Sequence, residues 1–272
     1  MTRTVLITGS SSGIGKTTAQ YFSEKGWNVI ATMRSPQAVE DLGAVPNVLV
    51  ARLDVQDGAS ISAAIEAGIA RFGKIDALIN NAGFGLFETT PLQKIQEQFD
   101  VNVFGVMNVT RAILPHFRHN KSGTILNIGS GAGVFGLPML SLYCASKFAL
   151  EGFIEALSYE LASPNIIVKM LEPGVVSTNF GKRSQEEAMR NDSIPDYNDF
   201  VVRTAALFAS LRASRSASEL GVAEVIYRAA TDGTNQLRYV ATADIEPLVR
   251  TRRETSEQEY IALMRSQFGA KA

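Results

Sequence analysis

A glycine-rich turn between an apolar run and a helical pattern constrains the fold of this chain more than any other feature. The apolar run 5–7 reads as a strand, a helical pattern follows at 14–25, and the turn between them holds Gly9, Gly13 and Gly15. Glycine lets the backbone adopt positive φ and approach a ligand closely, and the free amides at the start of the next helix attract an anion. The turn therefore predicts a binding site for nucleotide phosphates, although an ordinary glycine-rich turn has the same pattern.

The rest of the chain alternates between strand-like and helical segments. The predicted strands are 4–8, 28–33, 48–53, 77–80, 123–128, 166–171 and 237–241. The predicted helical segments are 14–25, 36–42, 59–72, 91–118 and 143–161. Because the strands are apolar throughout, they favour an α/β fold in which helices cover both faces of a parallel sheet. A ligand of such a sheet lies at the carboxyl ends of the strands.

Composition narrows the class of partner. The 272 residues include 26 basic and 27 acidic side chains, so the formal net charge of −1 favours neither nucleic acid nor an anionic membrane. No apolar run approaches the ~18 residues that span a bilayer, and we recognise no signal peptide before the first strand. The single cysteine, Cys144, excludes an internal disulfide. We therefore expect a cytoplasmic protein with a small-molecule partner.

We expect one domain over residues 1–272, because α/β chains of roughly 200 to 250 residues commonly form one domain. The segment 177–216 is richer in charged residues, serine and asparagine, and it interrupts the pattern until near Glu219. We interpret it as a lid over the active site, with a plain surface insertion as the alternative. Residues 254–268 predict a peripheral C-terminal helix.

The glycine spacing separates the nucleotide-binding motifs. A P-loop ends in Gly-Lys-Ser/Thr, as residues 15–17 do, but its first glycine would fall on Ser10, and the GxGxxG spacing also fails. The spacing is TGxxxGxG, and four further features accompany it. These are Asn-Asn-Ala-Gly at 80–83, Asn102, Ser130, and Tyr143 with Lys147. In this set the chain resembles the short-chain dehydrogenase/reductase family in its classical form.

The resemblance implies a doubly wound Rossmann fold with a seven-stranded parallel sheet, and hydride transfer with a nicotinamide cofactor. Relatives form dimers or tetramers through the helices 91–118 and 143–161, so we expect a homo-oligomer. The cofactor-binding residues that it implies are Gly9, Ser11, Ser12, Gly13, Ile14, Arg34, Asp54, Val55, Asn81, Ala82, Gly83, Tyr143, Lys147, Pro173, Gly174, Val176 and Thr178. One departure is Gly129, where many relatives carry a second serine; we match Ser130 to the catalytic serine.

The spacing of Tyr143 and Lys147 points to acid–base chemistry. Four residues apart on a helix, they share one face, so an ammonium can lie beside a phenol. Together with a positively charged nicotinamide, it can lower the pKa of the phenol from the ordinary value of about 10. Tyr143 would be the general acid in carbonyl reduction and the base in alcohol oxidation, and Ser130 would hydrogen-bond the substrate oxygen. The resemblance adds that Lys147 binds the nicotinamide ribose and that Asn102 holds a water in a proton relay. An amphipathic helix with a surface lysine, and an asparagine that only kinks its helix, are the structural alternatives.

Other chemistries find little support. The two histidines, His116 and His119, suggest no metal site. A GxSxG motif around Ser130 would need glycines at positions 128 and 132, which are isoleucine and alanine, so a serine hydrolase is disfavoured. Cys144 fits a small buried hydrophobic residue better than a nucleophile.

The predicted choice between NAD and NADP(H) depends on the residue that follows the second predicted strand. NAD-binding chains place an acidic residue about 20 residues after the glycine turn, but this strand ends at Arg34 and the next acidic residue is Glu40. Arg34 is placed to bind a 2′-phosphate, assisted by Ser11 and Lys16, which predicts NADP(H). A solvated turn arginine is the alternative. The resemblance places Asp54 and Val55 against the adenine.

Apolar residues dominate the predicted substrate pocket. Besides Ser130 and Tyr143, these residues are Phe87, Phe135, Leu137, Leu140 and Val175, with Phe180, Met189 and Phe200 closing from the lid. They predict a hydrophobic ketone, aldehyde or alcohol as substrate, as in the hydroxysteroid and retinol dehydrogenase branch that the chain resembles. They could instead merely pack the lid against the core. A ketoacyl-carrier-protein reductase and a non-catalytic NADP(H)-binding redox sensor remain as alternative functions.

Overall fold

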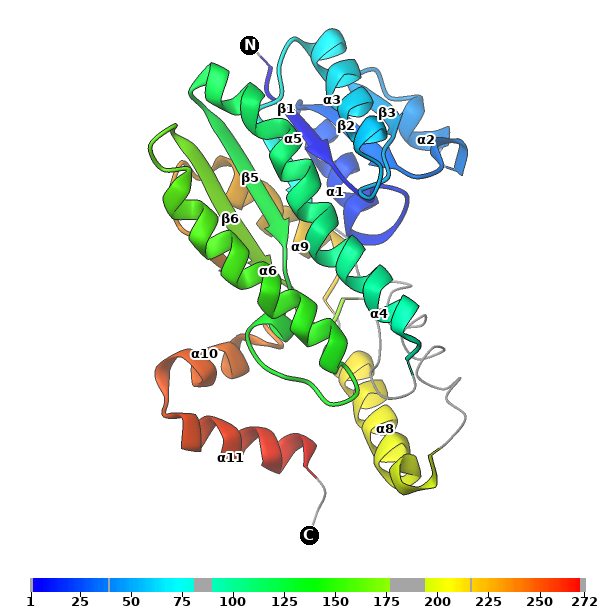
Figure 1. Cartoon of the computed structure of the whole chain (residues 1–272), viewed down its shortest axis with the longest axis vertical. Coiled ribbons are helices and arrows are strands. Elements are labelled where there is room, and N and C mark those ends of the chain that lie inside the picture. The colour runs from blue at the N-terminus through cyan, green and yellow to red at the C-terminus, as the bar shows by residue number, and fades with distance from the viewer. Residues whose placement is uncertain (1, 39, 81–89, 177–193, 216, 270–272) are drawn as a thin grey trace.

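The computed structural model describes residues 2–38, 40–80, 90–176, 194–215 and 217–269, and its centre is a parallel sheet of seven strands (Figure 1). The strands are β1 (Thr4–Ile7), β2 (Asn28–Met33), β3 (Val48–Arg52), β4 (Ala77–Asn80), β5 (Gly123–Ile128), β6 (Ile166–Glu172) and β7 (Arg238–Val240). They lie in the order β3-β2-β1-β4-β5-β6-β7. The predicted α/β fold is therefore confirmed, and the direction of strand addition reverses between β1 and β4.

Helices cover both faces of the sheet. In the part of the chain that the structure describes, these are α1 (Gly13–Glu24), α3 (Gly58–Phe72), α5 (Gly105–Asn120), α6 (Ser141–Glu160) and α9 (Glu219–Thr231). Phe22 of α1 and Val222 of α9 pack in one core cluster, whereas α3, α5 and α6 contribute to the other. Strands with apolar residues on both sides thus bury both faces, as parallel sheets do.

The predicted helix 91–118 is interrupted in the structure. Helix α4 (Leu92–Phe99) is followed by a π-helical turn, η2 (Asp100–Phe104), before α5 begins at Gly105. A Cβ on Gly105 would lie 2.6 Å from Cγ2 of Val55, so the glycine allows this helix to approach the loop after β3. The predicted helix 36–42 is also divided, into a 3₁₀ turn, η1 (Pro36–Ala38), and the single-turn helix α2 (Glu40–Gly43).

The C-terminal part lies near the carboxyl ends of β5 and β6 (Figure 1). It comprises η4 (Pro195–Tyr197), α8 (Asn198–Arg215), α10 (Glu246–Glu254) and α11 (Glu257–Phe268). Val249 of α10 and Met264 of α11 pack against Phe135 in a third hydrophobic cluster. Of the predicted lid, residues 177–193 and 216 lie outside the described residues. Within the described ranges, no helix has the length and apolar character to cross a membrane.

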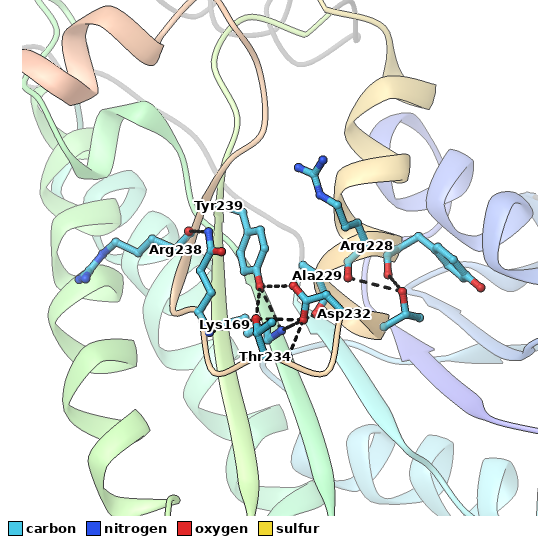
Figure 2. Close-up of polar contacts among 10 residues, drawn as sticks. Lys169, Arg228, Ala229, Asp232, Thr234, Arg238 and Tyr239 are labelled. Atoms are coloured by element: carbon cyan, nitrogen blue, oxygen red, sulfur yellow. Dashed lines mark hydrogen bonds and ion pairs between the residues drawn. The ribbon is translucent and has the colours of Figure 1, made fainter.

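A buried polar network holds the edge strand β7 to its neighbours (Figure 2). Lys169 of β6 is 1% exposed, and its Nζ donates to Ala229 O at 2.8 Å and to Asp232 Oδ1 at 2.6 Å. The same Nζ lies 3.1 Å from the hydroxyl oxygen of Tyr239, which in turn donates to Asp232 Oδ2. The network thus joins β6, β7 and the end of α9.

Candidate active site

The glycine turn after β1 has the geometry of an anion-binding loop. Gly9 and Gly13 have φ of 70° and 58°, in the left-handed region that favours glycine. Ser10 is buried and fixes the turn, because its N donates to Thr32 O at 2.9 Å and its Oγ donates to Ile7 O at 3.0 Å. Helix α1 then begins with no acidic residue in its first turn.

The residues that open α1 are accessible to a ligand. Ser11 and Ser12 are exposed, Ile14 is half-buried, and Ser12 makes no side-chain capping hydrogen bond with the described residues. The amides of the first helical turn therefore remain available for an anion. Together with the two positive-φ glycines, this fits the pyrophosphate of a dinucleotide.

Two basic side chains near this turn differ in their partners. Arg34 follows β2, is exposed, and makes no hydrogen bond or ion pair with any described residue. Lys16, which the sequence analysis expected to assist Arg34, instead pairs with Asp41 of α2 at 2.8 Å. Of the two cations, the structure thus leaves Arg34 open to an incoming anion.

The loop after β3 lies beside the π-helical turn. Asp54 is half-buried, and its Oδ1 accepts a hydrogen bond from Gln56 N at 3.1 Å. Val55 is also half-buried and lies against Gly105. Both follow the carboxyl end of a strand, the edge at which Gly9 and Arg34 also lie.

Ser130, Tyr143 and Lys147 meet beyond the end of β5. Ser130 precedes the 3₁₀ turn η3 (Gly131–Gly133), and its Oγ accepts a hydrogen bond from Ala132 N at 3.1 Å. Its side chain also hydrogen-bonds Tyr143 in the first turn of α6. Lys147 is 4% exposed, its Nζ donates to Ile128 O at 3.0 Å, and Nζ lies 5.7 Å from the centroid of the Tyr143 ring. The structure therefore brings together the three residues that the sequence matched to catalytic positions.

Burial dominates the electrostatics of this trio. It raises the pKa of Tyr143 to about 12, although the hydrogen bond with Ser130 lowers that pKa in part. It lowers the pKa of Lys147 to about 8, although the negative charge of Glu151 opposes the shift. The sequence predicts a lowered pKa for Tyr143 from Lys147 and a positively charged nicotinamide together; without the nicotinamide, burial outweighs Lys147, whose ammonium bonds the carbonyl of Ile128 and not the phenol. At neutral pH Tyr143 is thus a protonated phenol that can donate.

Asn102 contacts α6 through Ser146. It is fully buried in the π-helical turn, and its Nδ2 donates to Ser146 Oγ at 2.9 Å. Ser146 Oγ in turn donates to Tyr143 O at 2.8 Å. Asn102 Oδ1 is buried without a partner among the described residues. Such an acceptor suits an ordered water, although the structure places Asn102 against Ser146 and not against Lys147.

The loop after β6 is held by two residues that the sequence analysis missed. Gly174 N donates to Thr242 Oγ1 at 2.8 Å, and Val175 N donates to Asp244 Oδ2 at 2.9 Å. A Cβ on Gly174 would lie 2.4 Å from Asp244 Oδ2, so only glycine fits there. Thr242 and Asp244 lie some 70 residues away in sequence, and no local motif pointed to them.

This loop also contacts the turn that carries Ser130. Pro173 is buried, and its carbonyl accepts a hydrogen bond from Gly131 N at 3.0 Å. Val176 is half-buried and forms a parallel bridge with Ala217, which lies two residues before α9. Of the predicted cofactor residues after β6, Pro173, Gly174 and Val176 are therefore fixed beside the predicted catalytic serine.

The predicted pocket residues divide by exposure. Leu137, Leu140 and Val175 are half-buried, as is Phe200 of α8, whereas Phe135 is 2% exposed and packs against α10 and α11. In this structure Phe135 therefore supports the wall from behind. The remaining predicted site residues lie outside the described residues: Asn81, Ala82, Gly83, Phe87, Thr178, Phe180 and Met189.

Within the described ranges, no group of three or more His, Cys, Asp or Glu side chains could hold a metal ion. Cys144 is buried, its Sγ accepts a hydrogen bond from Leu137 N at 3.4 Å, and burial raises the pKa of its thiol. The thiol form is a poor nucleophile. Cys144 therefore contributes to packing beside Tyr143, the predicted catalytic tyrosine.

Gly129, the departure from the family pattern, has a steric cause. A Cβ at this position would lie 2.7 Å from Met170 Sδ and 3.3 Å from Glu151 Oε1. A serine there would have to displace Met170. The space beside Gly129 is instead taken by the buried carboxylate of Glu151, which the sequence analysis did not single out.

Comparisons with known proteins agree with this geometry. A family model described as short chain dehydrogenase matches residues 3–189. Human 17-beta-hydroxysteroid dehydrogenase type 1 is 35% identical over 291 residues, covering 99% of this chain and 87% of that protein. A 3-ketodihydrosphingosine reductase from Bacteroides thetaiotaomicron is 40% identical over 205 residues, covering 74% of this chain and 73% of the relative.

Solved structures give the same fold with either nicotinamide dinucleotide. A short chain dehydrogenase/reductase from Burkholderia phymatum in complex with NAD has a TM-score of 0.80 and 25% identity, covering 100% of this chain and 98% of that one. ElxO with NADP bound has a TM-score of 0.69 and 26% identity, covering 89% and 98%. By fold, site geometry and sequence, the chain belongs to the short-chain dehydrogenase/reductase family of oxidoreductases.

Proposed function

We propose that this protein is an NADP(H)-dependent oxidoreductase that interconverts a hydrophobic ketone or aldehyde and the corresponding alcohol. The observation that supports it most is the meeting of Ser130, Tyr143 and Lys147 beyond β5, on the edge of the sheet that also carries the glycine turn. A protonated phenol beside a hydroxyl and an ammonium can polarise a carbonyl oxygen and protonate it.

Each residue has a role in this reaction. The nicotinamide, when bound, supplies or accepts the hydride. Tyr143 donates its proton to the carbonyl oxygen during reduction and takes it back during oxidation, while Ser130 hydrogen-bonds that oxygen. Lys147 holds a positive charge near the phenol, and the unpartnered Oδ1 of Asn102 holds a water that returns the proton.

The preference for NADP(H) follows from the end of β2. Arg34 is exposed and unpaired among the described residues, and no carboxylate stands at the strand end where a ribose hydroxyl would be bound. A guanidinium binds a phosphate through two parallel hydrogen bonds, which favours a 2′-phosphate over a hydroxyl. Because solved family members carry either dinucleotide, this local chemistry is what separates the two.

The cofactor preference is tested with Arg34→Ala. We expect kcat/KM for NADPH to fall by about 10- to 100-fold, since a charge-assisted contact contributes roughly 1.5–3 kcal/mol, and the value for NADH to change little. Arg52→Ala is the matched control, because Arg52 is an exposed arginine at the end of neighbouring β3 that already pairs with Asp57 at 3.2 Å. An NADPH preference that survives in Arg34→Ala would contradict the assignment.

The proposed substrate class rests on apolar side chains beside the trio. Leu137, Leu140 and Val175 are half-buried there, and two relatives are named for a 3-ketosphingoid and a hydroxysteroid. Both are lipophilic molecules with a ketone or a secondary alcohol. An apolar pocket discriminates weakly, by roughly 1–3 kcal/mol per methylene, so we expect several such substrates.

A substrate panel tests the function itself. NADPH consumption is measured with steroid ketones, aryl ketones, sugars and short acyl thioesters, and we expect the highest kcat/KM with the first two classes. A strong preference for a sugar would contradict the apolar pocket, and a preference for acyl thioesters would favour a ketoacyl-carrier-protein reductase. Absence of turnover with every carbonyl would favour a dinucleotide-binding sensor.

Assembly into a homo-oligomer is supported by exposed apolar side chains on neighbouring helices. Leu92 of α4 is 80% exposed, and Phe104 of η2 and Phe148 of α6 are 48% and 42% exposed. Apolar patches of this kind commonly mark an interface. Light scattering of the wild type and of Phe104→Ser with Phe148→Ser tests it: we expect an oligomer in the first and a loss of mass in the second.

A further inference from the structure

Glu151 continues the catalytic face of α6. Tyr143, Lys147 and Glu151 follow each other at intervals of four residues, so their side chains leave the same side of the helix. Glu151 is 8% exposed, and its Oε2 accepts a hydrogen bond from Arg238 Nε at 3.0 Å. Its Oε1 is buried and has no hydrogen-bond partner among the described residues. A buried carboxylate oxygen without a hydrogen-bond partner costs free energy, so its presence requires an explanation.

Lys147 and Glu151 reach the same place at the end of β5. Lys147 Nζ bonds the carbonyl of Ile128, and Glu151 Oε1 lies 3.3 Å from where a Cβ of Gly129 would be. Gly133 packs against the same two residues of α6. A Cβ on Gly133 would lie 3.1 Å from Glu151 Cγ and 3.1 Å from the carbonyl oxygen of Lys147. The carboxylate and the ammonium therefore border one peptide unit, without a direct ion pair between these two described residues.

Further charged groups face Glu151 from three other elements. Arg238 of β7 bonds Glu151 and also pairs with the exposed Glu155. Glu172 at the end of β6 is fully buried and pairs with Arg253 of α10. Burial first, and then the negative charge of Glu172, raise the pKa of Glu151, while the two arginines oppose this. Among the cations near Glu151, Lys147 is the one that takes part in the proposed reaction.

We propose that Glu151 is a positioning residue that keeps Lys147 charged while Tyr143 donates its proton. This inference rests on the proposed function, and Glu151 acts through Lys147 without touching the reacting atoms. A buried ammonium loses its hydration, and its charged form survives only if a negative charge lies near. Gly129 belongs to this arrangement because its missing side chain makes room for the carboxylate.

The pH dependence of carbonyl reduction tests the proposal. Reduction needs Tyr143 protonated and Lys147 charged, so kcat/KM falls as pH rises through the pKa of Lys147, which is about 8. In Glu151→Gln that pKa is lower still. We expect wild-type kcat/KM at about pH 6 and an alkaline limb shifted down by about one pH unit, hence a loss of roughly tenfold at the alkaline end.

Glu155→Gln is the matched control. Glu155 lies one turn further along α6 and pairs with the same Arg238, but its side chain is 45% exposed. If Glu151 only anchored β7 through Arg238, both variants would lose activity by a factor that does not depend on pH. Glu151→Asp keeps the negative charge, so its alkaline limb is expected close to that of the wild type. An unshifted limb in Glu151→Gln would overturn the proposal.

A second readout separates this proposal from the proposed function. The Cε signal of Lys147 in protein labelled with ¹³C-lysine, assigned by its loss in Lys147→Met, reports the pKa of Lys147 without turnover. We expect a lower pKa in Glu151→Gln and an unchanged one in Glu155→Gln. In the wild type, the ionisation of Glu151 should also change the chemical shift of the Lys147 Cε signal, in a second and smaller step of the titration. This measurement requires no variant. Inactivity with every carbonyl would refute the function alone, whereas a Lys147 signal that ignores Glu151 would refute the coupling alone.

Discussion

Two pairs, each of a buried lysine and a tyrosine, lie on opposite faces of the sheet and are built differently. In the pair on α6, Lys147 Nζ lies 5.7 Å from the Tyr143 ring centroid and bonds the carbonyl of Ile128. In the pair on β6 and β7, Lys169 Nζ lies 5.3 Å from the Tyr239 ring centroid and bonds the carboxylate of Asp232 directly. Both lysines are almost inaccessible to solvent.

The difference lies in how completely each charge is compensated. Lys169 has a carboxylate, a backbone carbonyl and a phenol oxygen within hydrogen-bond distance (Figure 2). Lys147 has a carbonyl in contact, and its nearest acidic neighbour forms no direct ion pair with it. A fully paired buried charge fixes structure, whereas an incompletely paired one keeps a shifted pKa and can respond to a ligand.

Among the variants that test this comparison, the largest expected effect is on turnover. Tyr143→Phe removes the proposed proton donor and should lower kcat by about 10²- to 10⁴-fold, with little change in cofactor affinity or stability. Steady-state kinetics and binding of NADPH measured by fluorescence check both parts.

Tyr239→Phe is the matched variant at the structural pair. It removes a hydroxyl that donates to Asp232 and should cost about 1–3 kcal/mol of stability, while kcat stays near that of the wild type. Near-normal kcat in Tyr143→Phe, or a catalytic defect in folded Tyr239→Phe, would reverse the roles assigned to the two pairs.

The next effect in size concerns Lys169. Lys169→Met leaves Asp232 and Tyr239 without their buried cation and should lower the free energy of unfolding by about 3–5 kcal/mol. Urea denaturation of the wild type and the variant measures it. Lys94→Met serves as control, because Lys94 pairs with Glu97 on the surface and its loss should cost under about 1 kcal/mol. Equal decreases in the free energy of unfolding of Lys169→Met and Lys94→Met would show that the burial of Lys169 adds no stability.

The smallest expected effect is acid sensitivity. Burial alone would raise the pKa of Asp232, but hydrogen bonds from Lys169 and Tyr239 outweigh it and hold that pKa well below its ordinary value. The stability from this ionised carboxylate is present above the unfolded pKa of about 3.9 and is lost as pH falls towards the folded pKa. Between about pH 5 and pH 3, Tm should therefore fall by roughly 2–4 °C more in the wild type than in Asp232→Asn. Parallel Tm curves would exclude the network as the acid-labile part.

Local sequence patterns predict the parts of this molecule that depend on nearby residues. The strands 28–33, 77–80 and 123–128 have the predicted bounds, because their mainly apolar segments are bordered by polar or glycine residues. The shared helix face of Tyr143 and Lys147 likewise follows from a spacing of four. The glycine turn is of the same kind, since the positive φ at Gly9 and Gly13 is a local preference of glycine.

Long-range partners could not be predicted in this way. Arg238 reaches Glu151 across 87 residues, and Lys16 turns to Asp41 because α2 places that carboxylate nearby. Phe135 is apolar and suits either a pocket or a core, and its position under α10 and α11 decides for the core. Lys169 did carry a signal, since a lysine in the centre of an apolar strand demands a buried partner.

The π-helical turn at Asp100–Phe104 has a consequence for insertions and deletions. A π turn holds one residue more than an α turn, so this segment resembles the trace of a single inserted residue. Removing one residue would let α4 and α5 join as one continuous α-helix, but it would rotate α4 against α5 by about 100°. Asn102, on the widened turn, would then leave the side that contacts Ser146. The number of residues in this turn is therefore as strict a requirement as their identity. A relative that lacks one residue here would need its asparagine at another position to make the contact with α6.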